Sequence, residues 1–229
     1  MKKRLHGLFF EWPDINPKQL TCFALTNEAK SIPDKFWGPF NQVLITGIGR
    51  ENAEKSILAF FAKKITRRVF TCGFAGGLNP ALKLGEVVFE LAGTAANDQK
   101  LVANLAAAGA KPVKFFCADR IVTTIAEKKK LRAETGADAV EMESAPIHAV
   151  CRERGIPCAT VRVISDTAGE DLPLDFNALS RPDKNLDYGK LFLAIARSPG
   201  KIGALMQLQK KTKFAAERLA EVLAKITFP

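Results

Sequence analysis

Short apolar segments rich in β-branched and aromatic residues alternate along the chain with longer segments of helical period. The apolar segments predict strands at residues 20–25, 42–46, 68–72, 86–91, 113–117, 137–141 and 158–164. The segment 51–64 predicts a helix, because one face of it would hold Ala53, Ile57, Phe60 and Phe61. Further helices are predicted at residues 98–108, 125–134, 144–154, 190–197 and 202–226. This alternation predicts an α/β fold with helices on both faces of a sheet.

Capping residues set the ends of two of these helices. Thr124 and Glu127 have the spacing of a capping box, and Gly136 follows as a helix stop. Pro146 falls in the first turn of the next helix, where its missing amide would have no helical partner. The segment 172–186 contains two prolines and several charges, so we predict a long functional loop there.

Composition bounds the class of protein. The chain has 229 residues, 47% of them hydrophobic, which predicts one domain over residues 1–229 with a preamble at 1–18 and a C-terminal helix at about 201–226. Five cysteines without a CxxC pair and only two histidines predict neither a zinc site nor a disulfide framework. Reduced cysteines indicate a cytoplasmic protein. The apolar stretches are too short for a membrane span or a signal peptide.

The charge balance is strongly basic, with 34 Lys and Arg against 24 Asp and Glu and a formal net charge of +10. Such an excess fits nucleic acid, an anionic membrane surface, an anionic substrate or simple solubility. No basic motif is interleaved with aromatic residues, so nucleic acid is not an expected partner. The C-terminal helix carries basic and apolar residues, so it either contacts a membrane peripherally or presents a solvated basic face.

Two glycine-rich segments follow predicted strands. Gly47-Ile-Gly49 opens a helix, as a phosphate-binding turn does, but Asn52 breaks the dinucleotide-binding fingerprint, and no acidic residue follows at the required distance. This segment is either an anion-binding turn or a tight strand-to-helix turn. The second segment is Cys72-Gly-Phe-Ala-Gly-Gly-Leu-Asn-Pro80. It either lets a ligand lie on bare backbone or forms a turn with positive φ.

Carboxylates and one arginine lie at the ends of two later strands. Glu141 and Glu143 project the same way, and Glu143 precedes a helix, where it either holds a ribose diol or compensates helix charge. Arg162 interrupts an apolar strand, so it needs an anionic ligand or carboxylate partners such as Glu28 or Glu143. Asp166 lies at the strand exit, where it either transfers a proton or caps a turn.

Three ordered blocks resemble the purine nucleoside phosphorylase and uridine phosphorylase superfamily, on the branch of the methylthioadenosine/S-adenosylhomocysteine nucleosidases. The blocks are Gly73-Phe-Ala-Gly-Gly-Leu-Asn-Pro-Ala-Leu-Lys-Leu-Gly-Glu-Val-Val88, Ala139-Val-Glu-Met-Glu143 and Val161-Arg-Val-Ile-Ser-Asp-Thr-Ala168. The resemblance covers most of the chain between Thr21 and Asp166. It implies a three-layer α/β/α sandwich with a central mixed sheet. It also implies an enzyme that breaks the N-glycosidic bond of a purine nucleoside through an oxocarbenium-like transition state.

The resemblance assigns roles by position. Asp166 matches the acid that protonates the purine at N7, and Glu28 matches the carboxylate that activates water. Arg162 matches a residue near the nucleophile. Glu143 matches the ribose-diol ligand, Met142 packs against the sugar, and Gly76 and the backbone of Val122 match positions that contact the base. The substrate-binding set implied in this way is Glu143, Met142, Phe74, Gly76, Ile121, Val122 and Ser165.

Several positions depart from the superfamily pattern. Phe74 stands where a hydroxyl often helps to hold phosphate, and Gly169 stands where an acidic or amide residue is usual. The preamble and the basic C-terminal helix are more similar to the hopanoid-associated nucleoside phosphorylases, which act on adenosine attached to a lipid. The acceptor therefore stays open between water, favoured by Glu28 and Phe74, and phosphate, which Gly49 and Arg50 would hold.

Taken together, the sequence predicts an enzyme that cleaves a 5′-modified adenosine by hydrolysis or phosphorolysis. No metal or cofactor is expected, with phosphate as an alternative co-substrate, and a homodimer or larger homo-oligomer is expected. The competing hypothesis is a basic protein that binds a membrane or nucleic acid and has a decayed catalytic site. His148 has apolar neighbours that favour a structural role.

Overall fold

The computed structural model describes residues 16–30, 32, 40–95, 98–179 and 199–226. Its strands are β1 (Gln19–Phe23), β2 (Asn41–Ile45), β3 (Val69–Gly77), β4 (Val87–Ala92), β5 (Lys111–Pro112), β6 (Phe115–Cys117), β7 (Ala139–Glu141) and β8 (Cys158–Asp166). Its α-helices are α1 (Thr26–Ala29), α2 (Arg50–Phe61), α3 (Gln99–Ala107), α4 (Ile125–Thr135), α5 (Ser144–Glu153) and α7 (Ile202–Lys225), with 3₁₀ turns η2 (Gly93–Ala95) and η3 (Pro199–Lys201). Each element predicted within these ranges is present, with its boundaries shifted by a few residues.

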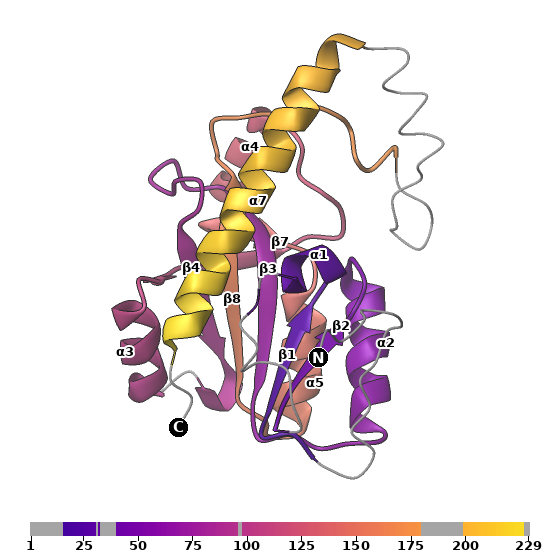
Figure 1. The fold of residues 1–229 in the computed structure, drawn as a ribbon, viewed down its shortest axis with the longest axis vertical. Helices are drawn as coiled ribbons and strands as arrows, with labels where there is room; N and C mark the ends of the chain where they lie inside the picture. The colour runs from indigo at the N-terminus through magenta and orange to yellow at the C-terminus, as the bar shows by residue number, and fades with distance from the viewer. Residues whose placement is uncertain (1–15, 31, 33–39, 96–97, 180–198, 227–229) are drawn as a thin grey trace, which may run out of the picture.

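The strands form one mixed sheet with β3 and β8 at its centre (Figure 1). Along the main path the order is β2-β1-β3-β8-β4-β5, and β1, β2, β3 and β8 run parallel. β4 is antiparallel to β8, and β7 is antiparallel to the end of β3, where Gly76 pairs with Val140. β6 runs parallel to β7. The expected central mixed sheet is therefore confirmed.

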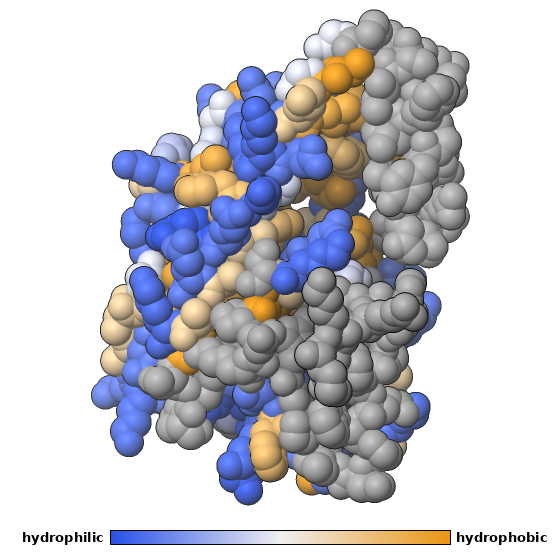
Figure 2. Space-filling view, in the orientation of Figure 1, coloured by the Kyte–Doolittle hydropathy of each residue, from blue (hydrophilic) through white to orange (hydrophobic). Residues whose placement is uncertain are grey.

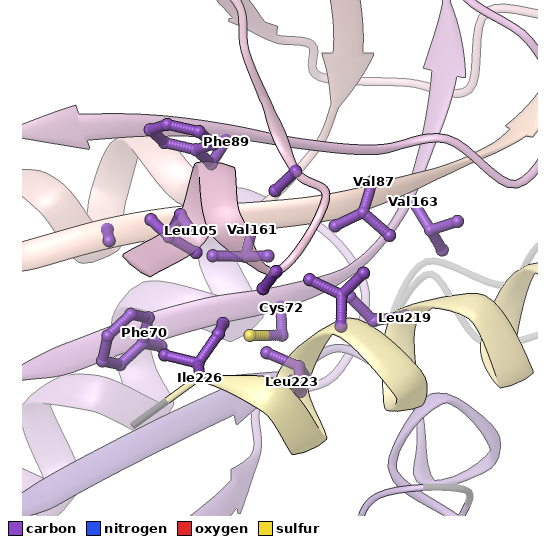
Figure 3. Close-up of a cluster of buried hydrophobic side chains, with 14 of the residues drawn as sticks. Phe70, Cys72, Val87, Phe89, Leu105, Val161, Val163, Leu219, Leu223 and Ile226 are labelled. Atoms are coloured by element: carbon purple, nitrogen blue, oxygen red, sulfur yellow. The ribbon is translucent and has the colours of Figure 1, made fainter. Parts of the chain in front are cut away.

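Two apolar cores lie on opposite faces of this sheet. On one face α3 and α7 cover β3, β4 and β8 (Figure 3). On the other face α2 and α5 cover β1, β2 and the first residues of β3 and β8. The first core includes Phe70, Cys72, Val87, Phe89, Val161, Val163, Leu219 and Leu223. The second includes Leu20, Cys22, Leu44, Ile57, Val69, Ile147 and Cys158. Helix, sheet and helix form the expected three layers.

β3 is longer than the sequence predicted. It continues past residue 72 through the glycine-rich segment to Gly77, because that segment stays paired with β8. Ala75 pairs with Ile164 but Gly76 pairs with Asp166, so β8 has one extra residue at this point. Such a bulge locally changes the direction of side chains. The segment is thus a paired strand and not a turn, with a positive φ of +143° at Gly73, and the contact of a ligand with its backbone stays a prediction.

The helix signals at α4 are confirmed. Thr124 Oγ1 accepts a hydrogen bond from Glu127 N at 3.2 Å, and Glu127 Oε2 accepts one from Thr124 N at 3.3 Å. Gly136 ends the helix in a left-handed conformation with φ +64°. The one-turn helix α1 was not predicted, because four residues are too short to show a period.

The C-terminal helix α7 packs on the sheet through its second half only. The first half extends past the end of the sheet (Figure 1), and Ile202 and Met206 there are 46% and 55% exposed. Hydrophobic residues gather at this end of the molecule (Figure 2). The buried residues of the helix are Ala215, Ala216, Leu219, Val222 and Leu223, and each buried leucine contributes about 1.5–3 kcal/mol.

Some expectations fall outside the described ranges. The preamble up to residue 15, the helix at 190–197 and the second part of the loop at 172–186 are among them. The extent of the domain, the homo-oligomer and the membrane contact stay predictions. No helix of the described part of the chain is long and apolar enough to cross a membrane.

Candidate active site

The predicted site residues gather where β3, β7 and β8 end. Arg162 and Asp166 lie on β8, and Gly76 lies opposite Asp166 on β3. Glu143 follows β7, and Glu28 lies on the short helix α1 that follows β1. The carboxyl ends of parallel strands form the usual ligand crevice of an open α/β sheet. The topology thus brings together residues from four separate stretches of the chain.

The guanidinium of Arg162 is 1% exposed and joins these strand ends. Nη2 donates to Glu141 Oε2 at 2.7 Å and to Glu143 Oε2 at 3.3 Å. It also lies 3.0 Å from Thr71 Oγ1, and Nη1 donates to the Cys72 carbonyl at 3.2 Å. The expectation that Arg162 needs carboxylate partners is confirmed. Its shortest carboxylate contact, however, is with Glu141, which the sequence did not single out as a partner.

Glu141 and Glu143 differ in protonation although they share Arg162. Burial favours the neutral form of Glu141, but Arg162 and hydrogen bonds from Ser144 hold its pKa below the ordinary value. Burial raises the pKa of Glu143 to about 7 against the effect of Arg162, and the charge of Glu141 adds to the rise. Glu143 Oε1 accepts a hydrogen bond from Gly49 N at 2.9 Å. Glu143 therefore changes charge near neutral pH, whereas Glu141 is a fixed anion.

Glu28 is buried beside the arginine. Its Oε2 accepts a hydrogen bond from Leu25 N at 2.9 Å, and its Oε1 accepts one from Phe74 N at 3.0 Å. Burial raises the pKa of Glu28, while Arg162 acts in the opposite direction. A Cβ on Gly73 would lie 2.6 Å from Arg162 Nη1 and 2.7 Å from Glu28 Oε1. Only glycine at this position lets the two side chains come so close to the strand.

Asp166 differs from the three glutamates, because the buried cation that it contacts is Lys128 and not Arg162. Oδ2 lies 2.6 Å from the ammonium of Lys128, and Oδ1 accepts a hydrogen bond from Ser165 Oγ at 2.9 Å. A Cβ on Gly76 would lie 3.2 Å from Asp166 Oδ2, tighter than an ordinary contact. Asp166 therefore ends β8 next to bare backbone, and it is not the turn-capping aspartate of the alternative interpretation.

Residues 121–123 form the segment that was expected to contact the nucleobase, and the loop after β8 holds this segment in place. The side chain of Asn177 accepts a hydrogen bond from Ile121 N at 2.9 Å and donates one to Ile121 O at 2.8 Å. Leu172 N donates to Thr123 O at 2.8 Å. Val122 lies between these two anchored residues, and its main chain has no hydrogen-bond partner in the described part of the chain. Its peptide groups are thus fixed in place and available to a ligand.

The structure also places two of the predicted substrate-binding residues, Met142 and Phe74, and the histidine that was expected to be structural. Met142 is half-buried between the two glutamates. The side chain of Phe74 packs against the core under α7, while its amide holds Glu28. His148 contacts Thr160 Oγ1 at 2.9 Å, and burial lowers its pKa to about 4, which agrees with a structural histidine.

The residues suggested for phosphate are already engaged. Gly49 N donates to Glu143, and the positive φ of +87° at Gly49 shapes the turn into α2. The exposed side chain of Arg50 donates to the Cys117 carbonyl at 3.2 Å and lies 3.4 Å from Asp119 Oδ1. Binding of an anion by Gly49 N or by Arg50 would therefore have to replace these contacts.

Sequence reasoning missed Lys128 and Asn177. Lys128 lies three residues after Ile125 and three before Leu131, so it shares their helix face and could have been marked as a buried cation. Asn177 lies in a loop without periodicity, and nothing in the sequence pairs it with Ile121, which is 56 residues away.

Comparison with known proteins identifies the family of this chain. Residues 90–195 match the family described as the phosphorylase superfamily. The aminodeoxyfutalosine nucleosidase of Campylobacter jejuni is 30% identical over 159 residues, which are 57% of this chain and 69% of the relative. The 5′-methylthioadenosine/S-adenosylhomocysteine nucleosidase of Marinomonas sp. is 29% identical over 172 residues, which are 62% of this chain and 74% of the relative.

A solved structure shows the same fold. The futalosine hydrolase of Helicobacter pylori superposes with a TM-score of 0.64 at 19% identity, covering 92% of this chain and 97% of that one. The resemblance carried by the three sequence blocks is thereby confirmed. The chain is an enzyme that belongs to the nucleoside phosphorylase superfamily.

Proposed function

We propose that this enzyme hydrolyses the N-glycosidic bond of a 5′-modified adenosine and releases adenine. The observation that carries the proposal is the placement of two carboxyl groups beside two glycines of β3, Glu28 at Gly73 and Asp166 at Gly76. Gly73 and Gly76 are three residues apart, about 10 Å along the strand, and a carboxyl group that activates water must lie several ångströms from the acid so that the sugar and the water fit between them. The nucleosidase names of the relatives fit this reaction.

In the proposed mechanism the two carboxyl groups divide the proton transfers. Glu28 orients a water and takes its proton, and the burial that raises its pKa makes it a better base. Asp166 delivers a proton to N7 of the purine, so that the base leaves as a neutral molecule. Each such assistance typically contributes about 10²–10⁴ in rate. The proposed steps use only side chains of this chain.

Binding of the nucleoside is assigned to neighbouring groups. The ionised carboxylate of Glu143 would accept hydrogen bonds from the ribose hydroxyls, and Met142 lies beside it for contact with the sugar. The main chain of Val122 would recognise the polar edge of the base, since its neighbours are held by Asn177 and Leu172. Buried polar contacts of this kind select strongly against analogues that lack the matching group.

Water is the acceptor that the contacts favour. A phosphate needs free positive charge or free amides, whereas Arg162 already contacts two carboxylates and Gly49 N already donates to Glu143. Arg50 is exposed and lies near Asp119. Phosphorolysis would require these contacts to be exchanged for the anion.

The decisive experiment measures base release from methylthioadenosine, adenosine and inosine, with and without inorganic phosphate. We expect adenine from methylthioadenosine without phosphate, and a loss of about 10²–10⁴ in kcat for Asp166→Asn. Strict dependence on phosphate would refute hydrolysis, and an active Asp166→Asn enzyme would refute the role of Asp166 as the acid. Absence of base release from every purine nucleoside would refute the function itself.

A second candidate is an adenosine whose 5′ substituent is a long apolar chain. The observation in its favour is the apolar first half of α7, with Ile202 and Met206 exposed near the basic residues Lys201 and Lys210. A 5′-alkylthio series of increasing length separates the two substrates. Falling kcat/KM beyond the methylthio compound would exclude the apolar substrate, and rising kcat/KM would replace the first proposal.

A further inference from the structure

Lys128 is a buried ammonium group to which the resemblance assigns no role. The residue is 0% exposed, and an isolated charge at such a place is strongly destabilising. All three of its N–H bonds have acceptors. They point to Asp166 Oδ2 at 2.6 Å, to the Thr167 carbonyl at 2.7 Å and to the Glu170 carbonyl at 2.9 Å. The ammonium is therefore matched to Asp166 and to the loop that follows it.

The charged groups around Lys128 are few and defined. Asp166 faces it directly from β8. The carboxylate of Glu170 accepts a hydrogen bond from Thr167 N at 2.7 Å and also pairs with Lys211 of α7. Lys211 therefore holds the carboxylate of Glu170, and the main-chain carbonyl of the same residue accepts from Lys128, which is paired with Asp166.

This arrangement raises a question about the proton that the purine needs. Asp166 Oδ2 accepts a hydrogen bond from Lys128, while Oδ1 lies 2.9 Å from the Ser165 hydroxyl, which also lies 3.3 Å from the Ala75 carbonyl. An oxygen that accepts from an ammonium group carries no proton of its own at that contact. The ammonium of Lys128 is the group in contact with it that does carry protons.

We propose that Lys128 is the positioning residue of Asp166 and the source of its proton. This inference rests on the proposed function. Lys128 holds Asp166 in the resting enzyme, and a proton leaves Nζ, is carried by the Asp166 carboxyl group and ends on N7 of the purine. The electron pair of the glycosidic bond goes to the purine, and the water oxygen bonds to C1′ as its proton passes to Glu28. Lys128 is then a neutral amine and Glu28 a neutral acid, and proton exchange with solvent restores both.

The test is a double-mutant cycle on Lys128→Met and Asp166→Asn. The measured quantity is kcat, and single-turnover rate constants on the same nucleoside, one that the wild type cleaves, isolate the chemical step. Because Lys128 acts through Asp166, we expect Lys128→Met to lose about 10²-fold or more in kcat. We expect the double variant to be no more than about twofold slower than Asp166→Asn alone. Multiplying losses would show a merely structural lysine and overturn the proposal. Lys129→Met, an exposed neighbour on α4, is the matched control and should keep the wild-type rate.

A second variant protects the test against a folding defect. Lys128→Arg keeps the charge and can donate to the same carbonyls, but a guanidinium does not give up its proton. We expect Lys128→Arg to fold with a normal melting temperature and to stay at least about tenfold slower than the wild type. Recovery of the wild-type rate would leave Lys128 as a countercharge only and refute the proton transfer. A wild type that cleaves nucleosides while Lys128→Met is equally fast would refute this inference and leave the proposed function standing.

Discussion

Adding a single methyl group at Gly73 should disturb the active site, because the new atom would collide with two of its buried side chains. In Gly73→Ala the new Cβ would lie 2.6 Å from Arg162 Nη1 and 2.7 Å from Glu28 Oε1, where an ordinary contact is 3.4–4 Å. Because both distances are too short, the arginine and the carboxylate must each move by about 1 Å. The φ of +143° adds strain, because a side chain rarely adopts it.

The expected loss of stability has two parts. Left-handed strain costs about 1–2 kcal/mol. Displacing Arg162 breaks its hydrogen bond to the Cys72 carbonyl, and a charged hydrogen bond is worth about 1.5–3 kcal/mol. The sum of about 2.5–5 kcal/mol corresponds to a fall in Tm of about 5–20 °C for a chain of this length. Since Glu28 moves as well, kcat/KM should fall by about 10²-fold.

Gly109→Ala is the matched control. Gly109 has a φ of +97°, but nothing lies within 4 Å of the Cβ that it would gain. The free energy of unfolding of Gly109→Ala should fall only by the backbone strain of about 1–2 kcal/mol, and the variant should keep full activity. Calorimetry and initial rates on both variants decide the matter. Equal Tm and equal kcat/KM for the two variants would refute the packing of Glu28 and Arg162 against Gly73.

Further predictions concern Glu143, the N-cap of α4 and the pair formed by Lys211 and Glu170. Burial raises the pKa of Glu143 to about 7, so the native protein holds a proton that an unfolded glutamate has lost above about pH 4.5. Between about pH 4.5 and about pH 7 the wild type should therefore lose stability relative to Glu143→Gln as the pH rises. Over the same range kcat/KM of the wild type should rise as the carboxylate forms, and a flat profile would contradict its role at the ribose. Thr124→Ala should destabilise the protein by about 0.5–2 kcal/mol in urea unfolding, because it removes the N-cap of α4, and Thr124→Ser should restore it. Lys211→Met should lower kcat while the exposed Lys213→Met does not, because Lys211 holds Glu170 beside Lys128, and equal rates would show that this pair is irrelevant to turnover.

Much of the fold was predictable because its signals are local. The capping box at Thr124 and the apolar runs of β1, β2 and β8 are set by neighbouring residues, and each is present where it was expected. The strand end predicted at residue 72 was wrong for a different reason. Glycines normally weaken a strand, but here pairing with β8 carries β3 through Gly76 and Gly77.

The candidate site was predictable in its members more than in its contacts. An arginine in an apolar strand had to meet carboxylates, and it does. Which carboxylate comes nearest depends on how β7 pairs with the end of β3, and no local pattern specifies that register. Lys128 was missed because a run of three lysines on a helix usually indicates a solvated face.

The C-terminal helix α7 covers the core and also contacts two segments near the active site. Phe214 sits against the turn at Gly85, where a Cβ would come within 2.4 Å of its ring, and Lys211 one turn earlier holds Glu170 in the loop that follows Asp166. A molecule bound to the exposed first half of α7 would therefore also act on the loop next to Lys128 and Asp166, the residues proposed to transfer the proton. Fusion partners or surface immobilisation at this helix should be chosen with that in mind, because they would act as effectors of the enzyme and not as neutral handles.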